Sequence, residues 1–173
     1  MFDVVNGLPV HPLVVHGVVV LLPLAILGTV AIAVRPGWRS RYGVLVVAVT
    51  AVGTALIPVA TSSGEALEKH VGDPGEHAQL GDQLIWFAVP LLLLVAALVG
   101  LDRRGSATRD TGEDGAATSA GSTTVVTVVA ALAVIASLAA GVQVYRVGDS
   151  GARAAWGDQV PSTSGPHSQV GDR

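Results

Sequence analysis

Four of the five histidines in the sequence lie at the ends of long apolar segments, where an imidazole could bind a metal ion or a haem iron. His11 and His16 stand at the start of the first segment, His70 follows the second, and His77 precedes the third. Neutral imidazole is the commonest metal ligand in proteins and also carries protons near neutral pH. His167 stands apart from this group. The positions of the other four indicate a histidine-bound cofactor at one end of the fold.

The composition narrows the chemistry that these histidines could share. The chain of 173 residues has no cysteine, and Met1 is its one methionine. Disulfides, thiolate nucleophiles and iron–sulfur ligation by this chain are excluded, and the ligands that remain are histidines, carboxylates and tyrosines. The net charge of −3 offers no electrostatic footprint for nucleic acid.

The elements that must position these residues are membrane-spanning helices. Half of the residues are hydrophobic (50%) and only 13% are charged, against about a quarter charged in soluble domains. A helix needs about 20 apolar residues to cross the hydrocarbon core. We expect helices at 13–34, 43–69, 77–101 and 123–147, which form an all-α, four-helix transmembrane bundle over 13–147. A short N-terminus (1–12), a flexible linker (102–122) and a mobile tail (148–173) complete the predicted organisation.

The arginines predict how this bundle is oriented, because Lys and Arg concentrate in the short cytoplasmic flanks of membrane helices. Six arginines are found in the connections after the first and third helices: Arg35, Arg39, Arg41, Arg103, Arg104 and Arg109. The second connection has only Lys69, and the C-terminal flank has Arg146 and Arg153. Both connections should therefore face the cytoplasm. Both termini and the four grouped histidines should then lie at the outer face.

Local sequence distinguishes the histidines from one another. Pro12 disfavours α geometry at His11, so we expect His11 to precede the helix. His16 sits one turn inside the membrane, where an ionisable residue is a functional candidate by default. His16 and His77 are therefore the preferred axial pair for a b-type haem, since histidine can hold haem iron. His11 and His70 are supporting or alternative ligands.

Two other interpretations of the histidines stay open. Zinc or copper could be bound without haem, since imidazole suits both metals. The ligands of that site would come from His11, His16, His70, His77, Glu65 and Glu76. In the other interpretation the histidines make ordinary hydrogen bonds, and the chain is a non-catalytic scaffold or assembly subunit. Stripes of small residues on its second and fourth helices would then mediate association, including a homo-oligomer.

Three stretches of the sequence resemble a bacterial membrane-protein family. GLPVHPLVVHGVVVLLPLAI, SSGEALE and EHAQLGDQ are similar to the domain of unknown function 2231 family, and the resemblance extends over 7–157 to include YRVGDSGARAAW. The family pattern has a bulky aromatic residue where this chain has Gly17. The resemblance implies a four-helix membrane protein without an established activity. Some related actinobacterial chains carry a Rieske module, which implies a link to electron transfer.

These features predict a multi-pass protein of the bacterial cytoplasmic (inner) membrane. The leading hypothesis is that it binds haem b and exchanges electrons with a redox partner at the outer face. Substrate-transforming chemistry is disfavoured, because Ser62 and Ser63 have no oxyanion-type motif beside them.

Overall fold

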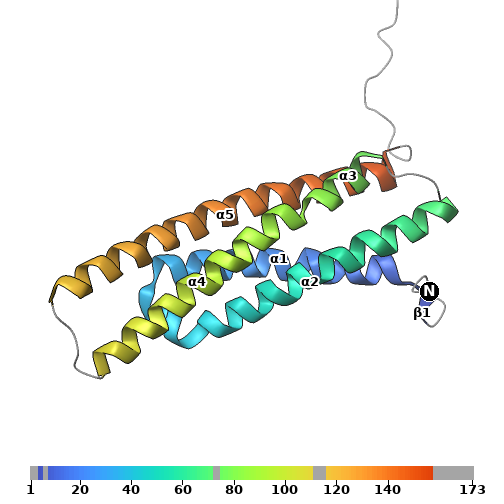
Figure 1. Ribbon diagram of the computed structural model, residues 1–173. Helices are drawn as coiled ribbons and strands as arrows, with labels where there is room; N and C mark the ends of the chain where they lie inside the picture. The colour runs from blue at the N-terminus through green and yellow to red at the C-terminus, as the bar shows by residue number, and fades with distance from the viewer. Residues whose placement is uncertain (1–3, 6–7, 72–74, 111–115, 158–173) are drawn as a thin grey trace, which may run out of the picture.

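The computed structural model is built almost entirely of helices (Figure 1). It describes residues 4–5, 8–71, 75–110 and 116–157, with side chains for 11–68, 75–106 and 123–157. The helices are α1 (Val10–Val34), the 3₁₀ turn η1 (Pro36–Trp38), α2 (Arg39–Val71), α3 (Glu76–Gln83), α4 (Ile85–Asp110) and α5 (Ala116–Trp156). Two short antiparallel strands, β1 (Val4–Val5) and β2 (Leu8–Pro9), precede α1.

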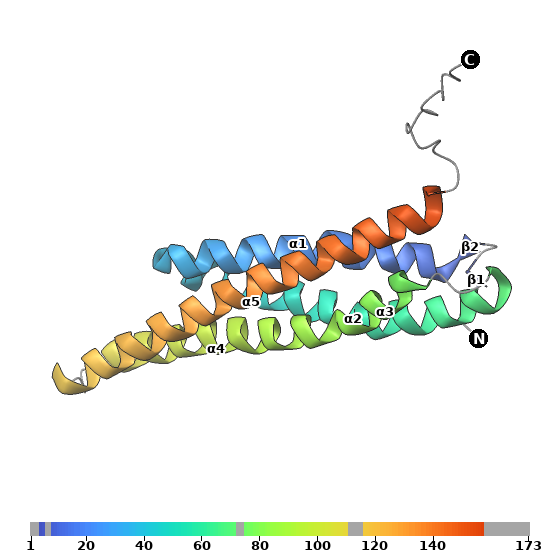
Figure 2. The same cartoon turned by 90° about the horizontal axis from the view of Figure 1, so that it is seen from above.

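The four long helices form an up-and-down bundle. α1 packs on α2 and on α5, and α4 packs on the same two helices, an arrangement that can be followed in Figure 2. Among the described residues, four segments are long and apolar enough to cross a membrane: His11–Val34, Pro36–Glu68, Glu76–Ser106 and Thr123–Trp156. The prediction of an all-α, four-helix transmembrane bundle is confirmed, whereas the orientation of its termini stays a prediction.

Large apolar side chains cover much of the outside of the bundle. Examples are Leu27, Leu93 and Leu138, each more than half exposed. Lipid is as apolar as these side chains, so their exposure costs nothing in a membrane, and the helices associate through close packing and interhelical hydrogen bonds. The interior contains two clusters of buried apolar residues, one around Leu22 and Ile57 and the other around Leu98 and Ile32.

The helices run further than the sequence analysis predicted. α4 continues to Asp110 and α5 begins at Ala116, so most of the predicted linker 102–122 is helical. α5 also continues to Trp156, nine residues into the segment predicted as a mobile tail. An Asp149–Arg153 ion pair at i,i+4 spacing supports this last part of α5. The rest of the predicted tail, 158–173, lies outside the described residues.

A helix break at Leu84 separates α3 from α4, where the sequence predicted one helix. The amide of Leu84 donates to the carbonyl of Gly81 (3.1 Å) instead of continuing the α-helical ladder. The buried amide group of Gln143, on α5, donates to the carbonyl of Leu80 (3.0 Å). The break and this bond hold α3 against α5. Gly75, just before α3, has a φ of 60°, a conformation that favours glycine.

Candidate functional site

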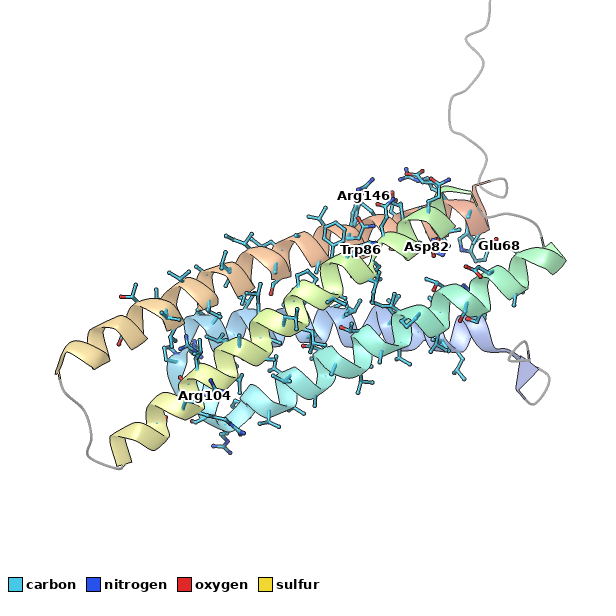
Figure 3. All side chains as sticks on the ribbon, in the orientation of Figure 1. Glu68, Asp82, Trp86, Arg104 and Arg146 are labelled. Atoms are coloured by element: carbon cyan, nitrogen blue, oxygen red, sulfur yellow. The ribbon has the colours of Figure 1, made fainter. Side chains whose placement is uncertain are left out.

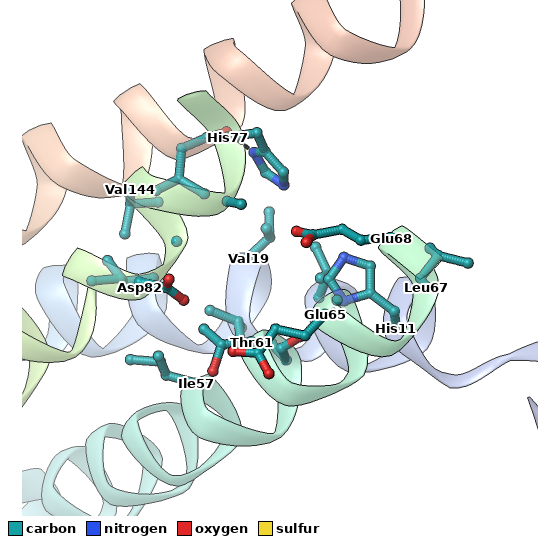
Figure 4. Close-up of a pocket in the computed structure, with 18 residues that line it drawn as sticks. His11, Val19, Ile57, Thr61, Glu65, Leu67, Glu68, His77, Asp82 and Val144 are labelled. Carbon is teal, nitrogen blue, oxygen red and sulfur yellow. Dashed lines mark hydrogen bonds between the residues drawn. The ribbon is translucent and has the colours of Figure 1, made fainter. Parts of the chain in front are cut away.

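A cavity of about 400 Å³ lies at the end of the bundle where α1 begins and α2 and α5 end (Figure 4). Its inner wall is apolar and includes Val18, Ile57 and Leu84. Its polar wall residues are Thr61, Glu65, Glu68 and Asp82, together with His11 and His77. Figure 3 places Glu68 and Asp82 at this end and Arg104 at the other. The cavity is thus apolar toward the interior of the bundle and acidic at its rim.

His11 reaches the cavity from the first turn of α1. Its Nδ1 lies 2.9 Å from the carbonyl oxygen of Ala60, on α2. A carbonyl only accepts hydrogen bonds, so Nδ1 carries the proton of the neutral ring and Nε2 keeps a lone pair. The hydroxyl of Ser63 lies 3.3 Å from Nδ1 and donates to the same carbonyl (3.0 Å). The ring packs closely against Gly64, where an added Cβ would lie 3.1 Å from Cε1.

His77 reaches the cavity from the start of α3 and makes the same set of contacts with α5. Its Nδ1 lies 3.1 Å from the carbonyl oxygen of Val147 and 3.3 Å from the hydroxyl of Ser150. Ser150 donates to that carbonyl at 3.0 Å. A Cβ on Gly151 would come within 2.9 Å of the His77 Cε1. Figure 4 shows the two rings on facing walls, each with its free nitrogen turned toward the space between them.

The sequence match covers this whole arrangement. Residues 7–164 match a family described as "Predicted membrane protein (DUF2231)". The chain belongs to the DUF2231 family. No curated protein and no solved structure matches it. The match includes both histidines of the cavity and the two helix segments that hold them.

The DUF2231 chain does not bring together the histidines that the sequence analysis preferred. His16 is exposed, and its Nδ1 bonds the carbonyl of Pro12 on its own helix. It does not line the cavity, so His77 faces His11 and not His16. The expectation that His11 precedes the helix is wrong as well, since α1 begins at Val10. The reason is that proline is well tolerated in a first helical turn, where its missing N–H has no acceptor to lose.

The remaining predicted residues separate into those at the cavity and those elsewhere. Glu65 lines the cavity, while Glu76 is exposed on α3 and does not. The side chains of His70 and His167 lie outside the described part of the chain. Among the described residues there is no group of three or more histidine, aspartate or glutamate side chains placed to hold a metal ion.

The residues that fix the two rings, Ser63 and Ser150 with the glycines that follow them, were not among the site residues predicted from the sequence. A signal was available in the sequence, because a Ser-Gly pair occurs in both SSGEALE and DSGARAA. These two pairs lie near the C-terminal ends of α2 and α5. Neither pair is a known catalytic or metal-binding motif. Their role appears only once the fold places each pair beside a histidine that is distant in sequence.

Proposed function

We propose that this DUF2231 protein binds a b-type haem between His11 and His77 and transfers electrons at the membrane. The observation that carries the proposal is the pair of facing imidazoles on separate helices. Each ring donates Nδ1–H to a backbone carbonyl, which leaves Nε2 unprotonated toward the same cavity. Metal-bound histidines commonly have this arrangement, because the outer hydrogen bond fixes the tautomer and the ring orientation.

The number of available ligands favours haem over a bare metal ion. Zinc sites use three or four protein ligands, and the described residues contain no such group. A haem needs only its axial ligands from the protein, since the macrocycle supplies the others. Two imidazoles are therefore enough for haem, whereas a zinc site would need further protein ligands.

The cavity wall also fits a flat apolar group. Val18, Ile57 and Leu84 supply apolar surface, and small residues such as Ala60 and Gly81 leave room beside it. When bound, haem supplies one-electron chemistry. The protein's own residues hold the two rings, keep water away from the inner wall and place negative charge at the rim through Glu65 and Glu68.

We place the protein in the bacterial inner membrane, with the cavity at the outer face. The arginine-rich end of the bundle, where Arg35, Arg39 and Arg103 lie, is opposite the cavity. Basic flanks remain on the cytoplasmic side during insertion. The redox partner would then approach from outside the cell or from within the membrane.

An absorption spectrum tests the proposal directly. The full chain, expressed with haem supply and purified in detergent, should show a Soret band and the spectrum of low-spin iron. His11→Ala and His77→Ala should each remove the low-spin spectrum or the haem itself. His16→Ala is the matched control on the same helix and should leave the spectrum unchanged.

The absence of a Soret band from the wild-type protein would overturn the haem proposal. Elemental analysis of the same sample would then distinguish stoichiometric zinc or copper from the scaffold interpretation. A haem spectrum that survives both the His11 and the His77 substitution would show that the axial ligands are misassigned.

A further inference from the structure

The two histidine sites are built from the same parts in the same order. In each site a carbonyl is followed three residues later by a serine and then by a glycine: Ala60, Ser63 and Gly64 in α2, and Val147, Ser150 and Gly151 in α5. The Nδ1–carbonyl distances are 2.9 and 3.1 Å, and both Nδ1–hydroxyl distances are 3.3 Å. Two unrelated hydrogen-bond networks would not be expected to have the same donors and acceptors at the same sequence spacing.

The match continues along the first helix of each half. Five residues of α1 are buried in the bundle: Val18, Leu22, Ala25, Thr29 and Ile32. The shift along the sequence that brings His11 onto His77 brings these five onto Leu84, Ala88, Leu91, Val95 and Leu98. All five of those residues are buried too. The same helical face therefore points inward in both halves.

The second helices match in the same way, under the shift that brings Ser63 onto Ser150. Buried Thr50 then falls on buried Ser137. Thr50 donates to the carbonyl of Val46 at 2.7 Å, and Ser137 donates to the carbonyl of Ala133 at 2.8 Å. Val46 and Ala133, which are also buried, are themselves equivalent under this shift.

The packing of the helices agrees with a two-fold relation between the halves. One half contains α1 and α2, and the other contains α3, α4 and α5. Exchanging the halves converts the α1–α2 contact into the α4–α5 contact and the α2–α4 contact into the α5–α1 contact, and all four occur. The cavity is lined by equivalent residues from both halves, such as Ile57 with Val144 and Ala60 with Val147, so it lies on the relating axis.

We infer that the domain consists of two copies of one helical hairpin, and that Ser63–Gly64 and Ser150–Gly151 are matching positioning residues for His11 and His77. Each glycine leaves room for the ring to lie on its helix. Each serine hydroxyl, together with the carbonyl to which it donates, accepts from Nδ1–H and so keeps the proton on Nδ1. The positioning of the two rings by these residues does not depend on the proposed haem function. The use of the two equivalent nitrogens as ligands on either side of the axis does rest on that function.

The copies differ at the rim of the cavity. The positions equivalent to Glu65 and Glu68 in the second half are Ala152 and Ala155. The carboxylates of Glu65 and Glu68 therefore have no counterpart in the second half, which contributes Asp82 instead. The walls that hold the ligand are two-fold, but the acidic side chains of the rim are divided unequally between the halves, with Glu65 and Glu68 on one side and Asp82 on the other.

The positioning is tested without any cofactor. Nitrogen NMR of ¹⁵N-histidine-labelled full chain, prepared without haem supply, reports which ring nitrogen carries the proton. His11 and His77 should both be protonated on Nδ1. Gly64→Ala should perturb the His11 signals alone, and Gly151→Ala the His77 signals alone. Alanine has a higher helix propensity than glycine, so neither substitution disfavours the helix that carries it.

The serines are tested by affinity for added haem. Ser63→Ala and Ser150→Ala should each weaken haem binding by about 10- to 100-fold, as loss of the outer hydrogen bonds of ligating histidines does, and to a similar extent. Ser62→Ala is the control, because Ser62 is exposed and its hydroxyl bonds the carbonyls of Pro58 and Val59, whereas the hydroxyls of Ser63 and Ser150 lie beside the histidine rings.

The outcomes separate the inference from the proposed function. Protonation on Nε2 in either histidine, or a glycine variant that leaves its own histidine unperturbed, would overturn the inference. Unequal serine effects would overturn the equivalence of the halves. The expected NMR result without haem binding would support the positioning and reject the haem.

Discussion

The Nε of Arg39 donates a hydrogen bond to the carbonyl oxygen of Ile32 at 2.8 Å, so the first residue of α2 closes the end of α1. A second bond runs from the same guanidinium to the carbonyl of Ala33 at 2.9 Å. Carbonyls at a helix C-terminus have no partner within the helix. Arg39 is only 6% exposed, and its other nitrogen lies 3.7 Å from Asp102, on α4. One side chain thus connects three helices at the end opposite the cavity.

Arg39→Met should lower the free energy of unfolding by about 1.5–3 kcal/mol, the range for hydrogen bonds made by a charged group. Thermal or denaturant unfolding in detergent measures the loss. Asp102→Asn should cost less than about 1 kcal/mol, because this ion pair is longer and partly exposed. Arg103→Met is the control at an exposed position of the same end. Equal stability of the Arg39 and Arg103 variants would contradict the assigned role of Arg39.

Gly43→Ala should destabilise the α2–α4 contact. A Cβ at this position would lie 2.8 Å from Cγ2 of Val99, too close without a shift. Overpacking of this kind costs about 1–3 kcal/mol. Gly100→Ala is the matched control, since nothing lies within 4 Å of its added Cβ. The double variant Gly43→Ala/Val99→Ala should recover much of the loss. A Gly43 variant as stable as the Gly100 variant would show that the helices are not in close contact there.

The orientation prediction can be tested with single cysteines, because the chain has no native thiol. Ser40 is exposed at the arginine-rich end and Gln79 at the cavity end. In intact cells an impermeant maleimide should label Gln79→Cys, and it should label Ser40→Cys only after the membrane is opened. The reverse pattern would place the cavity on the cytoplasmic side and reject the basic-flank argument.

If haem binds as proposed, Glu65→Gln and Glu68→Gln should each raise its midpoint potential, on the order of tens of millivolts. A carboxylate near the iron stabilises the ferric state, and removal of its charge favours reduction. Spectroelectrochemical titration measures the shift. Glu76→Gln, exposed and away from the cavity, should change the potential little. A lowered or unchanged potential in both rim variants would mean that the haem does not lie beside them.

The spanning helices were predictable because long apolar runs leave few alternatives in a membrane. The helix ends at 102–110, 116–122 and 148–156 were not, because small and polar residues such as those around Gly148 carry no apolar periodicity. The last part of α5 is held by neighbours that are distant in sequence. Ser150 meets His77, and Gln143 holds the carbonyl of Leu80.

The choice between His11 and His16 depends on helix phase. Five residues along a helix correspond to a rotation of about 140°, so one ring faces inward when the other faces out. His11 shares a face with Val18 and Leu22, both buried. α1 is apolar on every side, however, and a helix of that kind has no polar face to mark its outside. The sequence therefore could not say which histidine lies inside.

The partners of the two histidines also set the order in which the site can be assembled during synthesis. His11 finds Ala60 and Ser63 once α2 has been made, but His77 must wait for Val147 and Ser150 near the end of α5. A ribosome delivers these segments from the N-terminus onward. The second ring is therefore fixed only when the last helix enters the membrane. A ligand that needs both rings would therefore be retained only by chains that include α5. Chains that end before α5 would stay without the ligand and could be distinguished from full chains in this way.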